Sequence, residues 1–386
     1  MSVGVPRLSI VAALIGGVCM AVAYVVDAPR AAAAYLVAYA ACLGVALGAL
    51  AMVMIARVTA AHWFVALRRQ AEDIASTLPA FAVLAIPLLL SVRLLYVWSW
   101  PDTRIAADVR VAVHVKAAYL NVPFFITRAV VYFVVWIVVA ELLRRTSRAQ
   151  DHGDSPAIER RMYVVSAVGL VAFALTTSFA SFDWLMSLTP TWYSTIYGIY
   201  YFSGGMVGAL ALLTVVVAAE RRRGELPAEI GADHFHALAK LLLTFVLFWV
   251  YIAFAQLIVI WSAELPAERG WYAERLRGGW QALGGVVLLL HFALPFCALV
   301  VRAIKRSVRA MALLGAVVVA AHYLDVYWMV MPDAPFHGGW GFVADAGALL
   351  FVAGAAAACW VARRAGAPAV AVCDPRLAQS LEYSTE

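Results

Sequence analysis

Long apolar runs recur along this chain, and they limit its fold more than any other feature. Each is about 18 residues or longer, enough for a helix to cross the roughly 30 Å hydrocarbon core of a bilayer. Inside a bilayer the backbone must satisfy its own hydrogen bonds, so spanning runs of this kind form helices. We therefore predict an all-α, polytopic membrane protein with ten spans. The predicted spans are residues 8–26, 33–56, 79–98, 119–143, 162–188, 191–219, 236–263, 279–303, 309–331 and 343–362.

The composition supports a membrane protein. Hydrophobic residues make up 65% of the chain and charged residues 13%, whereas soluble domains carry about 25% charged residues. The first run could also be a signal peptide, because Arg7 precedes it and Ala21-Val22-Ala23 resembles a cleavage site. Its apolar run is longer than the usual 7–15 residues of such a peptide, which favours a retained helix.

Basic residues predict the orientation of the spans. With the N-terminus in the cytoplasm, the cytoplasmic segments carry 19 Lys and Arg residues and the opposite loops carry seven. This asymmetry predicts that both termini are cytoplasmic. The net charge of +6 is then a signal of topology and indicates no nucleic-acid partner.

The segments between spans are short. Residues 57–77 are amphipathic and are predicted to lie as a helix on the cytoplasmic face. Residues 99–118 are predicted to form an outer loop and residues 146–160 a cytoplasmic linker. No segment is long enough for a soluble domain, so this chain has no separate electron-carrying domain.

The cysteines do not form a recognisable site. Four of the five lie singly within apolar spans, and Cys373 lies near the C-terminus. No CxxC, CxxCH or iron–sulfur spacing is present, and no glycine-rich phosphate loop or zinc motif occurs. We predict no metal site and interpret the cysteines as small hydrophobic residues.

Ionisable residues inside the spans are the candidate functional residues, because hydrocarbon tolerates charge poorly. At about 1.5 Å per residue, two aspartates, two arginines and a histidine fall in the outer third of the membrane. His291 lies near mid-membrane, and Lys240 enters from the cytoplasmic side. The five outer residues are Arg93, Arg128, Asp183, His322 and Asp325.

Two interpretations of these residues remain open. In one, Asp183, Asp325 and His322 form a proton relay, Arg93 and Arg128 balance charge, and His291 and Lys240 extend the proton path. In the other, the same residues are static ion pairs that hold the helices together. His291 could equally make a hydrogen bond between helices. Haem ligation by the two histidines is disfavoured by their different predicted depths.

Residues 177–205, TSFASFDWLMSLTPTWYSTIYGIYYFSGG, are the most distinctive part of the sequence. Two apolar helices meet there across a short loop, and Asp183 lies inside the first. Six tryptophan and tyrosine residues crowd the same end, which is typical of an aromatic belt at a membrane surface. They are Trp184, Trp192, Tyr193, Tyr197, Tyr200 and Tyr201.

Three motifs in this order resemble a known family. They are SFDWLMSLTPTWYSTIYGIYYFSGG, the segment at residues 238–268, LAKLLLTFVLFWVYIAFAQLIVIWSAELPAE, and the ending DPRLAQSLEYSTE from Asp374. They resemble the second quinone-binding-type membrane subunit of alternative complex III, a quinol:cytochrome c oxidoreductase. That subunit belongs to the NrfD/polysulfide-reductase membrane-subunit group. The resemblance runs from residue 79 to the C-terminal tail.

The resemblance implies a domain organisation. It implies two N-terminal spans with an amphipathic segment at residues 1–78, a first four-helix bundle at 79–219, and a second at 220–362. Residues 363–386 would be a cytoplasmic tail. Because the tail is polar and resembles a motif, we expect it to dock on a neighbouring subunit.

The resemblance also implies a function. The chain would be an integral subunit of a quinol-oxidising complex in the bacterial cytoplasmic membrane and would couple quinol oxidation to proton transfer. It would carry no redox centre of its own, although quinone or menaquinone could bind. Haem and iron–sulfur centres would belong to partner subunits, which are an iron–sulfur protein, c-type cytochromes and a paralogous membrane subunit.

Two alternatives stay open. A secondary transporter would have broken helices at matching positions of two halves, but Pro87, Pro123, Pro295 and Gly204-Gly205 do not fall into a clear repeat. A purely structural anchor for electron-transfer subunits is the other alternative.

Overall fold

The computed structural model describes residues 4–153, 155–263, 266–334 and 341–384. All regular elements within these residues are helices. The main helices are α1 (Gly4–Val26), α2 (Ala28–Val58), α3 (Arg68–Ala75), α4 (Leu78–Leu90), α5 (Val92–Leu95), α6 (Ala107–Val115), α7 (Val122–Gln150), α8 (Pro156–Trp184), α9 (Tyr197–Arg222), α10 (Ala232–Ala263), α11 (Pro266–Arg275), α12 (Gly279–Val287), α13 (Leu294–Val300), α14 (Arg302–Lys305), α15 (Val308–Val330), α16 (Gly341–Arg364) and α17 (Leu377–Leu381).

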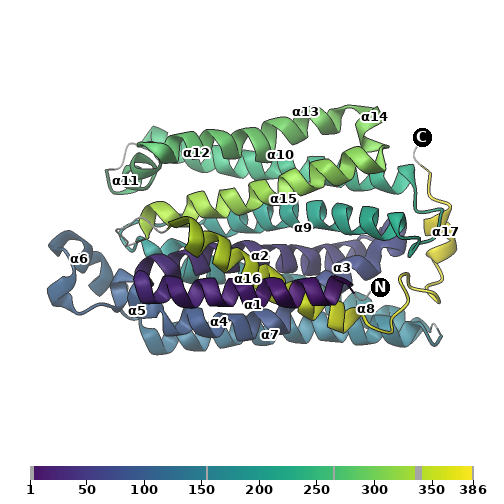
Figure 1. The fold of residues 1–386 in the computed structure, drawn as a ribbon, viewed down its shortest axis with the longest axis horizontal. Helices are drawn as coiled ribbons and strands as arrows, with labels where there is room; N and C mark the ends of the chain where they lie inside the picture. The colour runs from purple at the N-terminus through teal and green to yellow at the C-terminus, as the bar shows by residue number, and fades with distance from the viewer. Residues whose placement is uncertain (1–3, 154, 264–265, 335–340, 385–386) are drawn as a thin grey trace.

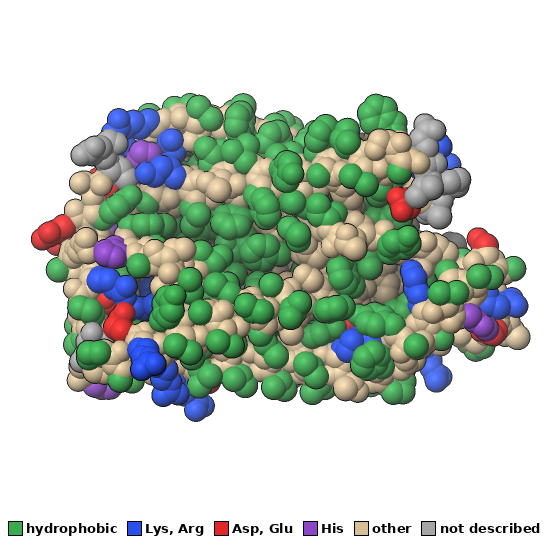
Figure 2. Space-filling view, turned by 180° about the vertical axis from the view of Figure 1, so that it is seen from behind, with side chains coloured by type: hydrophobic (Ala, Val, Ile, Leu, Met, Phe, Trp, Pro, Cys, Tyr) green, Lys and Arg blue, Asp and Glu red, His purple; other side chains and the backbone are tan. Residues whose placement is uncertain are grey.

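The long helices lie side by side along one axis (Figure 1). Ten of the described helical segments are long and apolar enough to cross a membrane. Hydrophobic side chains cover the middle of the bundle, and charged side chains gather at its two ends (Figure 2). The chain is therefore an all-α polytopic membrane protein, as the apolar runs predict.

The two ends of the bundle differ. One end carries the start of α1 together with α3 and α17, and we call it the terminal end (Figure 1). The other end carries α6 and α11, and we call it the loop end. The predicted outer loop at residues 99–118 contains α6 and lies at the loop end. The predicted linker at 146–160 is shorter than expected, because α7 continues to Gln150 and α8 begins at Pro156.

Helix α2 lies at the centre of the bundle, where it packs against α8, α9, α15 and α16. Small residues permit this packing: a Cβ on Gly48 would lie 2.5 Å from the carbonyl oxygen of Gly205 on α9. Close approach of helix backbones at small residues is a common packing mode in membranes. Helices α2 and α9 thereby join the group α4, α7 and α8 to the group α10, α12, α13 and α15 (Figure 1). The division into bundles at residues 79–219 and 220–362 stays a prediction.

Side-chain caps begin several helices. Asp27 accepts a hydrogen bond from the Arg30 N–H at 3.1 Å, and Asn121 accepts one from Phe124 N–H at 3.0 Å. Each cap satisfies one of the N–H groups that a helix start leaves unpaired. Proline follows within the first two positions of both helices, where its missing N–H costs nothing.

The third span is broken. Pro87 lies inside α4, which ends at Leu90, and α5 begins at Val92. Proline cannot donate a backbone hydrogen bond and so weakens the helix around it. At the end of α4 the Ser91 hydroxyl and the Ser91 N–H both donate to the Pro87 carbonyl, at 2.8 and 3.1 Å. The prediction of one continuous helix over 79–98 is therefore wrong beyond Leu90.

The charged helical part of the amphipathic segment at 57–77 is buried inside the protein. The segment forms a short 3-10 helix, His62–Leu67, and then α3, whose charged residues are buried. Arg69 donates to Asp151 at 2.5 Å, and the Ser147 hydroxyl donates to Glu72 at 2.7 Å. The amphipathic pattern indicated a polar face, but that face meets other charged residues of this chain and not water or lipid headgroups.

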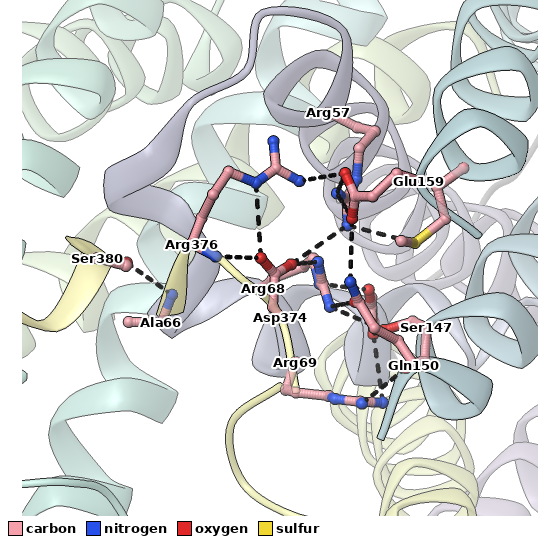
Figure 3. A network of polar contacts seen from close by, with 12 residues as sticks. Arg57, Ala66, Arg68, Arg69, Ser147, Gln150, Glu159, Asp374, Arg376 and Ser380 are labelled. Atoms are coloured by element: carbon pink, nitrogen blue, oxygen red, sulfur yellow. Dashed lines mark hydrogen bonds and ion pairs between the residues drawn. The ribbon is translucent and has the colours of Figure 1, made fainter. Parts of the chain in front are cut away.

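The C-terminal tail packs on its own chain (Figure 3). Asp374 lies 2.6 Å from Arg68 Nη1, and its side chain is fully buried. Arg376 pairs with Glu159 at 2.7 Å. The Ser380 hydroxyl accepts from Ala66 N–H at 3.0 Å. Contacts within the chain therefore order the buried residues of the tail, while Pro375, Ala378, Gln379 and Glu382 are exposed, and docking on a neighbouring subunit stays a prediction.

Asp374→Asn should loosen the tail, because it removes the buried carboxylate that pairs with Arg68 and Arg376 and leaves Arg68 with Glu72 as its remaining carboxylate partner. Breaking one side of a buried pair costs about 3–5 kcal/mol. Burial alone would raise the pKa of Asp374, but Arg68 and the Arg376 N–H outweigh it, so the pKa lies below its ordinary 3.8. The stabilisation is then complete above pH 3.8 and is lost as pH falls through the lower folded-state pKa. Limited proteolysis at the tail, for the variant at pH 7 and for wild type along an acid titration, measures both effects. A variant tail as resistant as wild type would contradict this.

Candidate functional site

Asp183 belongs to an ion pair. Its two carboxylate oxygens accept from Arg128 Nε and Nη2, each at 2.8 Å, and Oδ2 also accepts from the Tyr132 hydroxyl at 2.7 Å. The Asp183 side chain is fully buried between α7 and α8. Two parallel N–H···O bonds between a guanidinium and a carboxylate are a strong and directional arrangement. Both carboxylate oxygens of Asp183 are thus bound by the Arg128 guanidinium.

Arg128 is itself held in place. It donates from Nη1 to the Tyr119 carbonyl at 2.9 Å, and its guanidinium lies 3.8 Å from the Tyr119 ring centre and 4.3 Å from that of Phe124. Cations favour such positions over aromatic faces. The pair Asp183–Arg128 therefore has the geometry of a structural ion pair that joins α7 to α8.

Asp325 has a different set of partners. It accepts from the Tyr200 hydroxyl at 2.7 Å and from Trp249 Nε1 at 3.1 Å, and it is 2% exposed. Both donors are neutral. Among the described residues, the one basic group within ion-pair distance is His291, whose Nδ1 lies 3.9 Å from Asp325 Oδ2. The negative charge of Asp325 can therefore be removed by a proton on its own carboxyl group. Among the neighbouring described side chains within ion-pair distance, only a protonated His291 could balance it.

The two buried histidines meet beside Asp325. The ring centres of His291 and His322 lie 6.1 Å apart, and His291 packs edge-on against Trp249 at 4.4 Å. His322 Nε2 lies 3.2 Å from the Ala41 carbonyl, while neither ring nitrogen of His291 has a hydrogen-bond partner among the described residues. Two imidazoles and a carboxyl thus form one buried cluster, which we call the Asp325 cluster: Asp325, His291, His322, Tyr200 and Trp249.

The helix geometry changes at His291. Residues Leu288–Ala293 form a π-helical turn between α12 and α13. Pro295 has no N–H to offer the His291 carbonyl four residues earlier, which favours this departure from α geometry. Such turns are frequent at functional sites. The depth estimate for His291 assumed a regular helix, and it did not bring His291 within reach of His322 as the structure does.

Glycines on α9 make room for the cluster. A Cβ on Gly208 would lie 2.8 Å from His322 Cδ2, and one on Gly204 would lie 3.3 Å from Asp325 Oδ2. The first distance is too short for any side chain. Gly208 therefore provides the space for His322, and Gly204, which lies in the SGG sequence at residues 203–205, provides space beside Asp325.

Two predicted site residues lie elsewhere. Arg93 is exposed on α5 and makes no ion pair with Asp183 in the described structure, so its predicted pairing in the first bundle is wrong. Lys240 is exposed on α10 near the terminal end and has no contact with the Asp325 cluster. Their depth in the membrane was estimated from their distance along the helix. That distance does not indicate the direction in which a side chain points.

The aromatic belt is also corrected. Five of the six aromatic residues assigned to it are at most 5% exposed; Tyr193, at 60%, is the exception. Trp192 stacks on Trp271 with ring centres 4.6 Å apart, and Arg275 lies 3.4 Å from the Trp271 ring centre. Arg275 also pairs with Asp333 at 2.6 Å. These side chains pack inside the loop end of the protein.

Sequence reasoning missed the neutral partners. Tyr132, Tyr200 and Trp249 supply hydrogen bonds to the two carboxylates, and Gly208 supplies space. A signal was available for Tyr200, since it lies in the first of the three motifs quoted from the sequence, five residues before Gly205. No comparable signal marks Trp249 or Tyr132 among the many aromatic residues in the spans.

The two carboxylates can therefore do different things. A carboxylate fixed by a guanidinium holds charge, and one whose partners are neutral can change its protonation state when a nearby group exchanges the proton.

Within the described residues no group of three or more His, Cys, Asp or Glu side chains could hold a metal ion. No family model and no curated protein matches this chain.

Proposed function

We propose that this chain is an energy-coupling membrane subunit of a quinol-oxidising electron-transfer complex of the alternative complex III type. Its Asp325 cluster passes protons toward the loop end, while Asp183 and Arg128 hold the helices together. Oxidation of a quinol releases two electrons and two protons, and partner subunits with iron–sulfur and haem centres take the electrons. The three sequence motifs carry the resemblance to the complex.

One observation carries the proton-transfer role. Asp325 is buried with neutral donors, and a histidine lies 3.9 Å away with a second histidine behind it. Groups spaced in this way can exchange a proton through small movements or one water molecule. A purely structural cluster would not need a buried carboxylate without a cation, because burying an uncompensated charge destabilises a fold.

The broken helices favour this role over a transporter. A transporter built from two related halves has broken helices at corresponding positions. Here the breaks fall in the third span, after Pro87, and in the eighth, at His291. If the halves are spans three to six and seven to ten, these positions do not correspond.

The tagged chain should co-purify with an iron–sulfur protein and c-type cytochromes from its native membrane. The single chain produced alone should have no visible absorption from haem or iron–sulfur centres, since no metal-ligand spacing occurs in its sequence. Spectra and mass spectrometry of both preparations test this. A stoichiometric haem in the single chain, or a complex without redox subunits, would refute the assignment.

The orientation is part of the proposal. Both termini should be cytoplasmic, because 19 Lys and Arg residues lie in the segments on that side against seven on the other. Reporter fusions after Arg148 and after Arg364 should both report cytoplasm. Both positions lie toward the terminal end, so a periplasmic signal from either one would reverse the proposed direction of proton release.

A further inference from the structure

Three basic side chains meet at the terminal end, where α10 packs against α14. Lys240 lies on α10, and Arg302 and Lys305 lie on α14. Their charges, together with that of Arg306, all act on the His236 ring of α10, so side chains from two separate segments lie near this one ring. Lys and Arg side chains gather over this end of the molecule (Figure 2). We call Lys240, Arg302 and Lys305 the α10–α14 basic cluster.

No carboxylate within the described residues balances this cluster. The carboxylate of Asp233 pairs with Arg306, at 2.7 Å, and none of Lys240, Arg302 and Lys305 forms an ion pair with a described carboxylate. The basic residues of α2, α3 and the tail at the same end differ, because ion pairs neutralise them (Figure 3). The α10–α14 basic cluster therefore keeps an excess of positive charge that an anion could neutralise.

An exposed apolar surface continues from Lys240 along α10. Leu247, Tyr251 and Phe254 follow at helical spacing on the same face, and they are 42%, 65% and 59% exposed. Lys240 lies about 12 Å along α10 from its first residue, at about 1.5 Å per residue. A lysine at this depth can pack its stem on apolar side chains and carry its ammonium group to the membrane surface. The cluster therefore lies where the polar end of the bundle meets its apolar middle.

The cluster and this surface together limit the occupant. A guanidinium can donate two parallel hydrogen bonds to a phosphate, and an ammonium group attracts a phosphate as a point charge. Basic pockets between helices at the cytoplasmic side of a membrane bind anionic lipid headgroups in this way. A soluble anion could neutralise the charges but would make no contact with the apolar face of α10. A phospholipid carries its phosphate and its acyl chains in one molecule and can meet both surfaces.

We propose that the α10–α14 basic cluster binds the phosphate of an anionic phospholipid, whose acyl chains lie along the exposed face of α10. A zwitterionic phospholipid fits less well, because its own cationic group would be repelled by the three basic side chains. The inference goes beyond the proposed function and does not depend on it, because it involves neither proton transfer nor a redox partner.

Native mass spectrometry of the chain in neutral detergent measures binding one lipid at a time. The first phosphatidylglycerol should bind about tenfold more tightly than the first phosphatidylcholine, since each basic residue near the surface strengthens binding of anionic lipid. The Lys240→Gln, Lys305→Gln double variant should lose this preference. The Arg160→Gln, Arg161→Gln double variant is the matched control: it removes the same charge from exposed positions on α8 at the same end of the bundle and should keep the preference (Figure 1).

Equal affinity of the wild-type chain for the two lipids would overturn the proposal. A control that loses the preference as the lysine double variant does would also overturn it, because diffuse charge at this end would then suffice. Displacement of phosphatidylglycerol by equimolar inorganic phosphate would identify a site for free anions instead. Far-UV spectra and melting temperatures must be equal across the variants. If the lysine double variant does not fold, Arg302→Gln changes one exposed side chain and should lower the preference about fivefold.

Discussion

Asp325→Asn should leave the complex assembled and lower quinol-driven proton release and turnover by about 10²- to 10⁴-fold, the range for a lost acid–base group. Asparagine keeps the volume of the side chain, and its amide oxygen can still accept from one of the two donors, Tyr200 and Trp249, which bond to different carboxylate oxygens. It cannot take up or release a proton. Membrane vesicles containing the intact complex provide the assay, with electron transfer and proton release recorded together.

A matched control lies in the same cluster. Tyr200→Phe removes one hydrogen bond to Asp325 but leaves the carboxyl group, so it should reduce turnover far less than Asp325→Asn. Normal turnover and proton release in an assembled Asp325→Asn complex would contradict the proton-transfer role.

Asp183→Asn should instead destabilise the protein, so that little of the chain accumulates in folded form. The substitution leaves Arg128 buried without its carboxylate, and breaking one side of a buried pair costs about 3–5 kcal/mol. Total stabilities of proteins are only about 5–15 kcal/mol, so the loss is large. Detergent-extracted yield and thermal stability of the single chain measure it.

A second substitution tests whether the unpaired charge of Arg128 causes the loss of stability. Arg128→Gln in the Asp183→Asn background removes the unpaired cation, and the double variant should recover much of the stability that the single variant loses. The recovered variant should also turn over. A well-folded single Asp183→Asn variant, or a double variant that folds but cannot release protons, would contradict a structural role for this pair.

Hydropathy predicted most of the fold, because length and apolarity decide whether a helix can span a membrane. Ten spans were predicted, and the described part of the chain contains ten helical segments that meet those criteria. The errors lie where local chemistry changes the helix. Pro87 ends a span early, and polar contacts inside the protein bury α3.

The candidate site was only partly predictable. Apolar surroundings singled out Asp183, Asp325, His291 and His322 as residues that need an explanation, and all four are buried in polar contacts or close to one another. Sequence spacing could not show that Arg128 binds both carboxylate oxygens of Asp183. It also could not show that, among the described residues, Asp325 has only neutral hydrogen-bond donors, Tyr200 and Trp249. That difference depends on which helices face one another. It is the reason why we propose different roles for Asp183 and Asp325, for which the sequence predicted the same role.

Infrared difference spectroscopy of the working complex tests the central claim most directly, because it detects a carboxyl group that gains or loses a proton. Addition of quinol should produce a carboxylic-acid C=O difference band in wild type. The band should be absent in Asp325→Asn and retained in the Asp183→Asn, Arg128→Gln double variant. A band that persists in Asp325→Asn, or that disappears with the Asp183 carboxylate, would show that Asp325 is not the group that carries the proton.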